Sequence, residues 1–106
     1  MTKRLQIAVK LAAAALDVPT NQVLSSKKTR SSDLWTARCL SWWLVRSTSQ
    51  TRLIDIGEAF GITHASVING IQKCEDLRES DASFRALSDT LRERLSQECP
   101  AYGVPS

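Results

Sequence analysis

Apolar side chains recur at helical spacing along most of this 106-residue chain. The first such stretch runs from Met1 to Leu16 and is rich in alanine, which favours the helix and lets another helix lie close. The Asp-Val-Pro that follows ends it, because a residue before proline is pushed away from helical angles. Residues 20–24 then predict one short helical turn, with Thr20 as its N-cap.

A longer helix is predicted over residues 32–48, where apolar positions cover more than half of its circumference. We expect it to be the central helix of the core. Trp35, Trp42 and Trp43 lie in it and are expected to supply much of the buried area. Packing in the core is preferred for these rings over stacking on nucleic-acid bases.

A last helix is predicted from a cap at Asp81 to about Gln97, with both signs of charge on its outer face. The sequence shows no strand pattern and no internal repeat. It therefore predicts an all-α fold of about six helices. One helical domain is expected over residues 1–97 and a flexible tail over residues 98–106.

The stretch from Leu53 to Lys73 has the pattern of two helices joined by a very short turn. Gly61 is placed to end the first helix in a left-handed conformation, and Thr63 is placed to cap the second. Gly57 is small enough for the close approach that steeply crossing helices need. The pattern is typical of a helix-turn-helix, whose second helix enters the major groove of DNA, with a plain helical hairpin as the alternative.

The bounds of these two helices follow from the same pattern. Thr51 is the expected N-cap of the first helix, and the second is expected to continue to about Glu79. Val67, Ile68 and Ile71 recur at helical spacing in the second helix, so they are expected on its buried side.

The net charge is only +3, but the charge is unevenly distributed along the chain. Residues 1–52 hold nine Lys or Arg against two Asp or Glu, whereas residues 53–106 hold five against nine. This asymmetry indicates an anionic partner for one side of the molecule. Solvated faces without a partner are the alternative explanation.

Basic residues ahead of the helix-turn-helix are candidates for contact with the DNA backbone. Lys27, Lys28 and Arg30 form a basic loop that is expected on phosphates or, through an arginine, in the minor groove. A merely solvated loop is the alternative. Arg38 and Arg46, about two helical turns apart, are expected to follow one phosphate strand.

Other classes of function are disfavoured by the composition. Three widely spaced cysteines and a single histidine argue against a disulfide framework and against a zinc site. The nucleotide-cradle motif is absent and no nucleophile lies near the histidine, so we expect no enzymatic activity, no metal and no cofactor. No run of about 18 apolar residues occurs. We therefore expect neither a membrane span nor a secretory signal, and a cytoplasmic, nucleoid-associated protein.

The candidate base-reading residues gather at the start of the second helix of the motif. Thr63, His64 and Ser66 carry hydrogen-bonding groups, and Ala65 is suited to a thymine methyl. Asn69, one turn further along, is expected on an adenine edge or a phosphate. For His64, a surface side chain without a DNA contact is the alternative. The expected phosphate contacts are Lys27, Lys28, Arg38, Arg46 and Lys73.

These features together resemble domain IV, the C-terminal DNA-binding domain, of the bacterial replication initiator DnaA. The similarity covers about residues 3–97 and rests on the order of the helices and the basic loop, on the segment Ile56-Gly57-Glu58-Ala59-Phe60-Gly61, and on His64 and Val67. It implies a Trp-repressor-like fold that binds double-stranded DNA.

The resemblance also implies roles for particular residues. Arg30, by its spacing ahead of Ala37-Arg38, takes the place of the arginine that enters the minor groove in that family. His64 and Ser66 match the histidine and the second threonine of the family signature. Arg46 and Lys73 match phosphate-contacting lysines.

The chain differs from the family at Thr63, where the family has an aspartate, and at Ala65, where it has a threonine. One residue is also missing after Gly61, so the preferred DNA sequence of the family is not carried over. Counterparts of the initiator's ATPase and oligomerisation parts are absent, so we do not expect this chain to open an origin by itself.

Two hypotheses follow. The first is a bacterial or phage protein that binds double-stranded DNA and regulates transcription or replication initiation. The second is a helical interaction module that binds a protein of replication or transcription through the acidic second half of the chain.

Overall fold

The structure, a computed structural model, describes residues 3–24 and 32–98. Within these residues it contains six helices and no strand, which confirms the predicted all-α class. The helices are α1 (Lys3–Leu16), α2 (Thr20–Leu24), α3 (Ser32–Thr48), α4 (Leu53–Phe60), α5 (His64–Ser80) and α6 (Ala82–Glu98). Of the tail predicted over residues 98–106, Glu98 is the last residue of α6, and residues 99–106 lie outside the described residues. None of the helices in the described part of the chain has both the length and the apolar character needed to cross a membrane.

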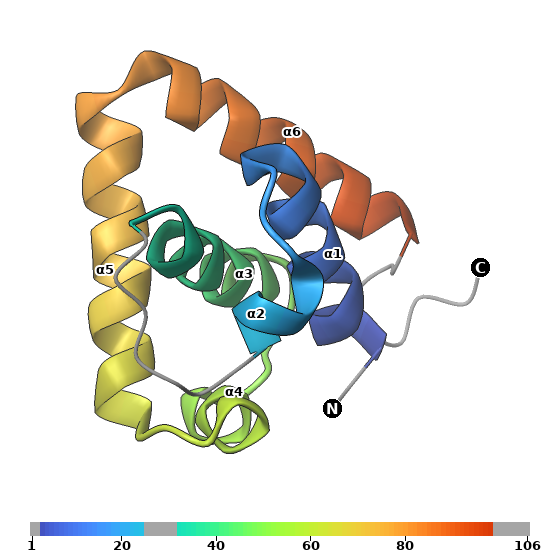
Figure 1. Ribbon diagram of the computed structural model, residues 1–106, viewed down its shortest axis with the longest axis vertical. Coiled ribbons are helices and arrows are strands. Elements are labelled where there is room, and N and C mark those ends of the chain that lie inside the picture. The colour runs from blue at the N-terminus through green and yellow to red at the C-terminus, as the bar shows by residue number, and fades with distance from the viewer. Residues whose placement is uncertain (1–2, 25–31, 99–106) are drawn as a thin grey trace.

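Helix α3 lies at the centre of the molecule, with the other helices arranged around it (Figure 1). Every residue from Ala37 to Val45 is buried, so this segment is covered on all sides. Helices α1, α5 and α6 all pack against it. The expectation of a central core helix is therefore confirmed.

The tryptophans of α3 differ in their surroundings. Trp42 and Trp43 are buried as expected, whereas Trp35 is 37% exposed, so its predicted burial is wrong. Trp35 lies in the first turn of α3, outside the fully covered segment. The rings of Trp35 and Trp42 form a T-shaped pair with 5.8 Å between centroids, and Trp42 forms a second T-shaped pair with Phe60 at 5.5 Å.

The alanines of α1 allow it to pack closely on α3. Ala8, Ala12 and Ala13 are fully or almost fully buried. The helix ends where the sequence predicts, at Asp17, which takes a left-handed conformation with φ 56°. The N–H of Val18 then donates to the carbonyl of Ala13 at 3.0 Å, which satisfies one of the last carbonyls of the helix.

Two predicted N-caps are wrong by one residue. At α2 the carbonyl of Pro19 accepts from the N–H of Val23 at 3.2 Å, so Pro19 rather than Thr20 is the cap. At α4 the cap is Arg52 rather than Thr51, because the extended chain continues one residue further. The Arg52 side chain bonds Asp55 at 2.9 Å across the first turn, and this contact raises the pKa of the guanidinium.

Helices α5 and α6 form a hairpin that turns at Asp81. As predicted, Asp81 caps α6, because its Oδ1 accepts from the N–H of Phe84 at 3.1 Å. Its own N–H donates to the carbonyl of Leu77 at the end of α5. One aspartate therefore serves both helix ends and fixes the turn between them.

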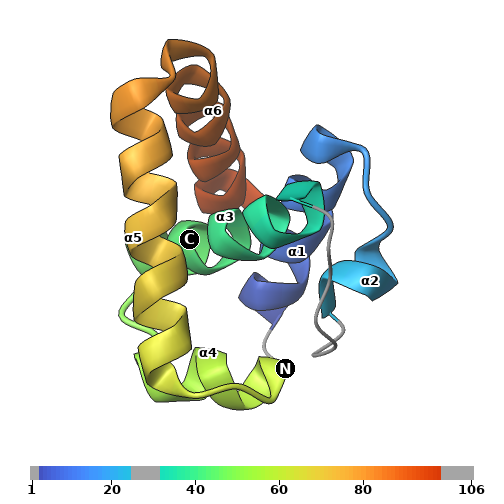
Figure 2. The same cartoon turned by 60° about the vertical axis from the view of Figure 1, so that its left-hand side comes forward.

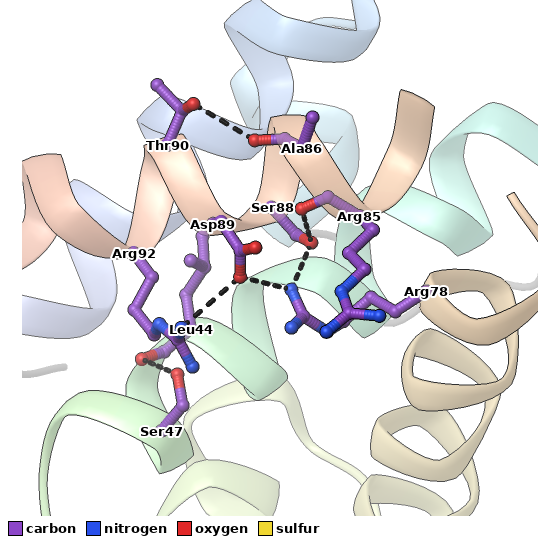
Figure 3. Close-up of polar contacts among 9 residues, drawn as sticks. All are labelled: Leu44, Ser47, Arg78, Arg85, Ala86, Ser88, Asp89, Thr90 and Arg92. Carbon is purple, nitrogen blue, oxygen red and sulfur yellow. Dashed lines mark hydrogen bonds and ion pairs between the residues drawn. The ribbon is translucent and has the colours of Figure 1, made fainter. Parts of the chain in front are cut away.

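A polar cluster holds α5 against α6 (Figure 3). Arg78 of α5 donates to Ser88 Oγ at 2.6 Å and to Asp89 Oδ1 at 2.8 Å, and Arg92 donates to the same Asp89 oxygen at 3.2 Å. Both guanidinium groups also lie over the Trp43 ring of α3, at 4.4 Å and 5.3 Å from its centroid. The cluster therefore joins α5, α6 and α3.

Candidate nucleic-acid interface

Helices α4 and α5 form the predicted helix-turn-helix, with α4 crossing the foot of α5 at one end of the molecule (Figure 2). Gly61 ends α4 with φ 68° and ψ 32°, as expected. Its N–H donates to the carbonyl of Glu58 at 3.2 Å, and the N–H of Ile62 donates to that of Gly57 at 2.9 Å. This pair of bonds is a Schellman motif, which satisfies the last carbonyls of α4 and sets the direction in which the chain leaves.

Gly57 allows the turn to fold back onto α4. A Cβ atom at this position would lie 2.7 Å from the carbonyl oxygen of Ile62 and 3.3 Å from the carbonyl carbon of Thr63. The expected need for close approach is confirmed, and the neighbour is the backbone of the turn itself. Backbone atoms cannot move aside as a flexible side chain can, so only glycine fits this turn without distortion.

Thr63 caps α5 as predicted. Its backbone is extended, and its Oγ1 accepts from the N–H of Ser66 at 3.3 Å. The two hydroxyl oxygens also lie 3.2 Å apart and share a hydrogen bond. The first turn of α5 therefore presents two coupled hydroxyl groups together with the exposed side chains of His64 and Ala65.

The outer face of α5 brings together the predicted residues of the motif. Ala65, Asn69 and Lys73 are exposed and follow one another at intervals of four residues, which places them along one side of the helix. His64 is exposed beside Ala65, and Ser66 is half-buried. The structure therefore presents Thr63, His64, Ala65, Ser66, Asn69 and Lys73 on one continuous helical surface.

The prediction that Ile68 lies on the buried side of α5 is wrong. This side chain is 45% exposed, whereas Val67, Gly70 and Cys74 form the fully buried side of α5. Ile68 follows Val67 directly, so the helical rotation turns it about 100° away from the core. Gln72 is also exposed on this outer surface and donates to Asp76 Oδ1 at 3.0 Å. Sequence reasoning missed both side chains as parts of the outer face.

The predicted contact of Arg38 with a DNA phosphate is contradicted as well. Arg38 as a whole is 8% exposed, and its guanidinium donates from Nε to the carbonyl of Val23 and from Nη2 to that of Gln22, both at 3.0 Å. These carbonyls end α2 and have no partner within that short helix. Burial lowers the pKa of Arg38. The side chain fastens α2 to α3 and is buried there, whereas Arg46 is exposed.

Arg46 is exposed at the end of α3, and its Nη1 donates to the carbonyl of Thr51 at 2.9 Å. This contact places the guanidinium beside the segment that enters α4. Lys27, Lys28 and Arg30 of the basic loop lie outside the described residues.

Charge changes sign along α5. The first three turns carry Lys73 and no acidic residue, whereas Glu75, Asp76 and Glu79 are exposed further along. A polyanion is therefore favoured at the start of the helix, where the helix dipole is also positive, and repelled from its far half.

The buried cysteines offer no site for chemistry. Cys39 and Cys74 are free thiols with no exposed surface, and burial raises the pKa of each to about 12. Both therefore stay protonated near neutral pH and pack as small apolar groups. Among the described residues, no group of three or more His, Cys, Asp or Glu side chains is placed to hold a metal ion.

Fold and turn together define a helix-turn-helix domain, and comparison with known proteins agrees. Residues 6–74 match the family described as the bacterial DnaA protein helix-turn-helix. The chromosomal replication initiator protein DnaA of Oenococcus oeni is 30% identical over 90 residues, 84% of this chain and 20% of that protein. DnaA of Thermus thermophilus is 42% identical over 57 residues, 53% of this chain and 13% of that protein. The chain belongs to the bacterial DnaA helix-turn-helix family.

A solved structure supports the same fold. A crystal structure of a DNA replication initiation factor superimposes with a TM-score of 0.75 at 24% identity, covering 90% of this chain and 29% of that one. The chain thus spans a fifth or less of the two initiator proteins and under a third of the solved one.

Proposed function

We propose that this protein binds double-stranded DNA in a sequence-dependent manner, with the start of α5 in the major groove. The observation that carries the proposal is the outer surface of α5, where exposed polar side chains follow a turn fixed by Gly61 and Thr63. A fixed turn matters because base readout requires side chains to be held in register with the groove. Membership of the DnaA helix-turn-helix family supports the same function.

Direct readout is assigned to the first two turns of α5. The ring of His64 and the amide of Asn69 supply donors and acceptors for base edges, and Ala65 suits a thymine methyl. The hydroxyl groups of Thr63 and Ser66 already share a hydrogen bond, so they act as one unit toward a base or a phosphate.

Contacts with the DNA backbone set position and affinity. Lys73 lies on the same side of α5 as Asn69, and Arg46 is exposed beside the entry to α4, so both are assigned to phosphates. Lys27 and Lys28 are also assigned to phosphates because they lie in the basic loop of the sequence. Arg30 is assigned to the minor groove because it takes the place of the family's minor-groove arginine. Arg38 is not part of this set, because its guanidinium is buried against α2.

The role that we propose is binding rather than catalysis, in the regulation of replication initiation or transcription on the bacterial nucleoid. The acidic far half of α5 sets the limit of the DNA footprint, because Glu75, Asp76 and Glu79 would repel phosphates.

Selection from a library of random duplex DNA tests the proposal. The protein should enrich a defined sequence, and His64→Ala should lose that preference, whereas Glu79→Ala on the far half of α5 should keep it. A recovered pool with no shared sequence would contradict sequence-dependent binding. Salt-insensitive capture of a protein, with no retention on DNA, would instead support the protein-interaction hypothesis.

A further inference from the structure

Ile68 is an exposed apolar side chain in the middle of an otherwise polar surface. Among the described residues, three large apolar side chains are exposed: Trp35 of α3, Ile54 of α4 and Ile68 of α5. Only Ile68 lies on the outer surface of the second helix of the motif. Its 45% exposure leaves a substantial apolar area in water, a state that contact with an apolar partner would relieve.

The packing of α5 explains why Ile68 cannot turn inward. Val67 on one side is fully buried, and the Trp42 ring fills the space at Gly70. The side of the helix that faces the core is therefore already occupied. Ile68 is directed by this packing toward the side that carries Ala65, one turn before it, and Gln72, one turn after it.

We propose that Ile68 is a specificity-determining residue that packs on the C5-methyl group of a thymine in the major groove. The inference rests on the proposed DNA-binding function and extends it to a particular base chemistry. Ala65 and Ile68 would then form a short apolar strip along the helix. Such a strip favours target sites with thymine at the positions that it covers.

The chemistry of base edges selects thymine as the partner. The C5-methyl of thymine is the apolar group that a base pair presents in the major groove, whereas the other groups there donate or accept hydrogen bonds. An isoleucine placed over a cytosine amino group or a guanine oxygen would remove water from it and return no hydrogen bond, which is unfavourable. Ile68 therefore both favours thymine and disfavours its competitors.

The place of Ile68 on the surface argues for DNA rather than for a protein partner. It lies between the first-turn residues His64 to Ser66 and the basic Lys73, all exposed or half-exposed on the same helix. An apolar contact flanked by base-reading groups on one side and a phosphate-binding cation on the other matches the groove of a duplex.

Uracil substitution tests the inference without changing base pairing. In the duplex recovered by selection, each thymine is replaced singly by deoxyuridine, which lacks only the methyl group, and affinity is measured by fluorescence anisotropy. The wild-type protein should lose about fourfold in affinity at the position that Ile68 covers, the effect of one buried methyl-sized group of about 0.8 kcal/mol. Ile68→Ala should bind the thymine duplex more weakly and show no further loss at that position.

Matched variants make the outcome decisive. Ile54→Ala, which removes a similarly exposed isoleucine from α4, should keep the wild-type methyl effect at that position. Thermal melting followed by circular dichroism checks that both variants fold. The inference is overturned if no methyl matters to the wild type, or if Ile68→Ala leaves every methyl effect unchanged. If selection recovers no defined duplex, the proposed function fails first and the inference falls with it.

Discussion

The ring of Trp42 in α3 lies directly against the backbone of Gly70 in α5. A Cβ atom at Gly70 would come within 2.3 Å of both Cε3 and Cζ3 of that ring. Trp42 is 1% exposed and is enclosed by the rings of Trp35 and Phe60, so it has no room to withdraw. At Gly70 the second helix of the motif therefore rests directly on this ring, beside the buried side chains of Val67 and Cys74.

Gly70→Ala should destabilise the protein even though alanine is the better helix former. Overpacking a core costs about 1–3 kcal/mol of stability. Because the added methyl group would clash with two atoms of the Trp42 ring, we expect a cost at the upper end of this range. Helix propensity returns about 1 kcal/mol, so the net loss in the free energy of unfolding should be about 2 kcal/mol. Urea denaturation measures it. Asn69→Ala, at the exposed neighbouring position, is the matched control and should not destabilise; equal stability of the two variants would refute the seating role of Gly70.

Gly61→Ala should destabilise the turn of the motif. Its left-handed conformation, φ 68°, places a Cβ atom too close to the backbone, at a cost of about 1–2 kcal/mol. Gly61→Asn should lose less, because asparagine tolerates this conformation better. In thermal unfolding of the three proteins, the melting temperature should fall in the order glycine, asparagine, alanine at position 61. An alanine variant as stable as the wild type would show that the turn can adopt another conformation.

Replacement of Asp17 should stabilise the protein. Asp17 has φ 56° at the end of α1, where a negative charge also opposes the helix dipole. Asp17→Asn removes the charge and should gain about 0.3–1 kcal/mol. Asp17→Gly also relieves the backbone and should gain about 1 kcal/mol or more. Calorimetric melting temperatures should rise from the wild type to Asp17→Asn to Asp17→Gly. An Asp17→Gly protein less stable than the wild type would contradict this order.

The cluster around Asp89 should make stability depend on acid pH. The hydrogen bond from Arg78 lowers the pKa of the Asp89 carboxyl below its ordinary value of 3.8. The ionised carboxylate therefore stabilises the folded state above this value, and the contribution is lost as pH falls through the lower folded-state pKa. Asp89→Asn should be less stable at neutral pH and should lose less stability on acidification.

Denaturation curves recorded from neutral pH to about pH 2 measure this dependence. Arg78→Gln removes the main cause of the lowered pKa of Asp89. Like Asp89→Asn, it should lose less stability than the wild type on acidification. An Asp89→Asn protein with the wild-type pH profile would show that the carboxylate contributes nothing through its charge.

The helices and the turn were predictable because their signals are local. Gly61 and Thr63 define the turn by their own backbone and hydroxyl chemistry, and the structure shows both in the expected roles. Asp81 likewise caps α6 through its own side chain. Signals of this kind need no knowledge of the rest of the chain.

The failures concern contacts between distant parts of the chain. Val67, Ile68 and Ile71 are equally apolar, and the burial of one side of α5 is decided by Trp42 packing at Gly70. Arg38 has the charge of a surface residue, but it is buried because the carbonyls that end α2 need donors. Neither fact can be read from periodicity or composition.

The salt dependence of DNA binding is the sharpest test of whether the outer face of α5 binds DNA. Affinity for the selected duplex is measured by anisotropy from about 50 mM to 200 mM salt, for the wild type and for Lys73→Ala. We predict affinity that falls steeply with salt, a slope smaller by about 0.9 in the variant, and an unchanged sequence preference, because one phosphate contact is lost. If the wild type does not bind at about 50 mM salt, this face does not bind DNA; if both proteins give the same slope, Lys73 does not contact a phosphate.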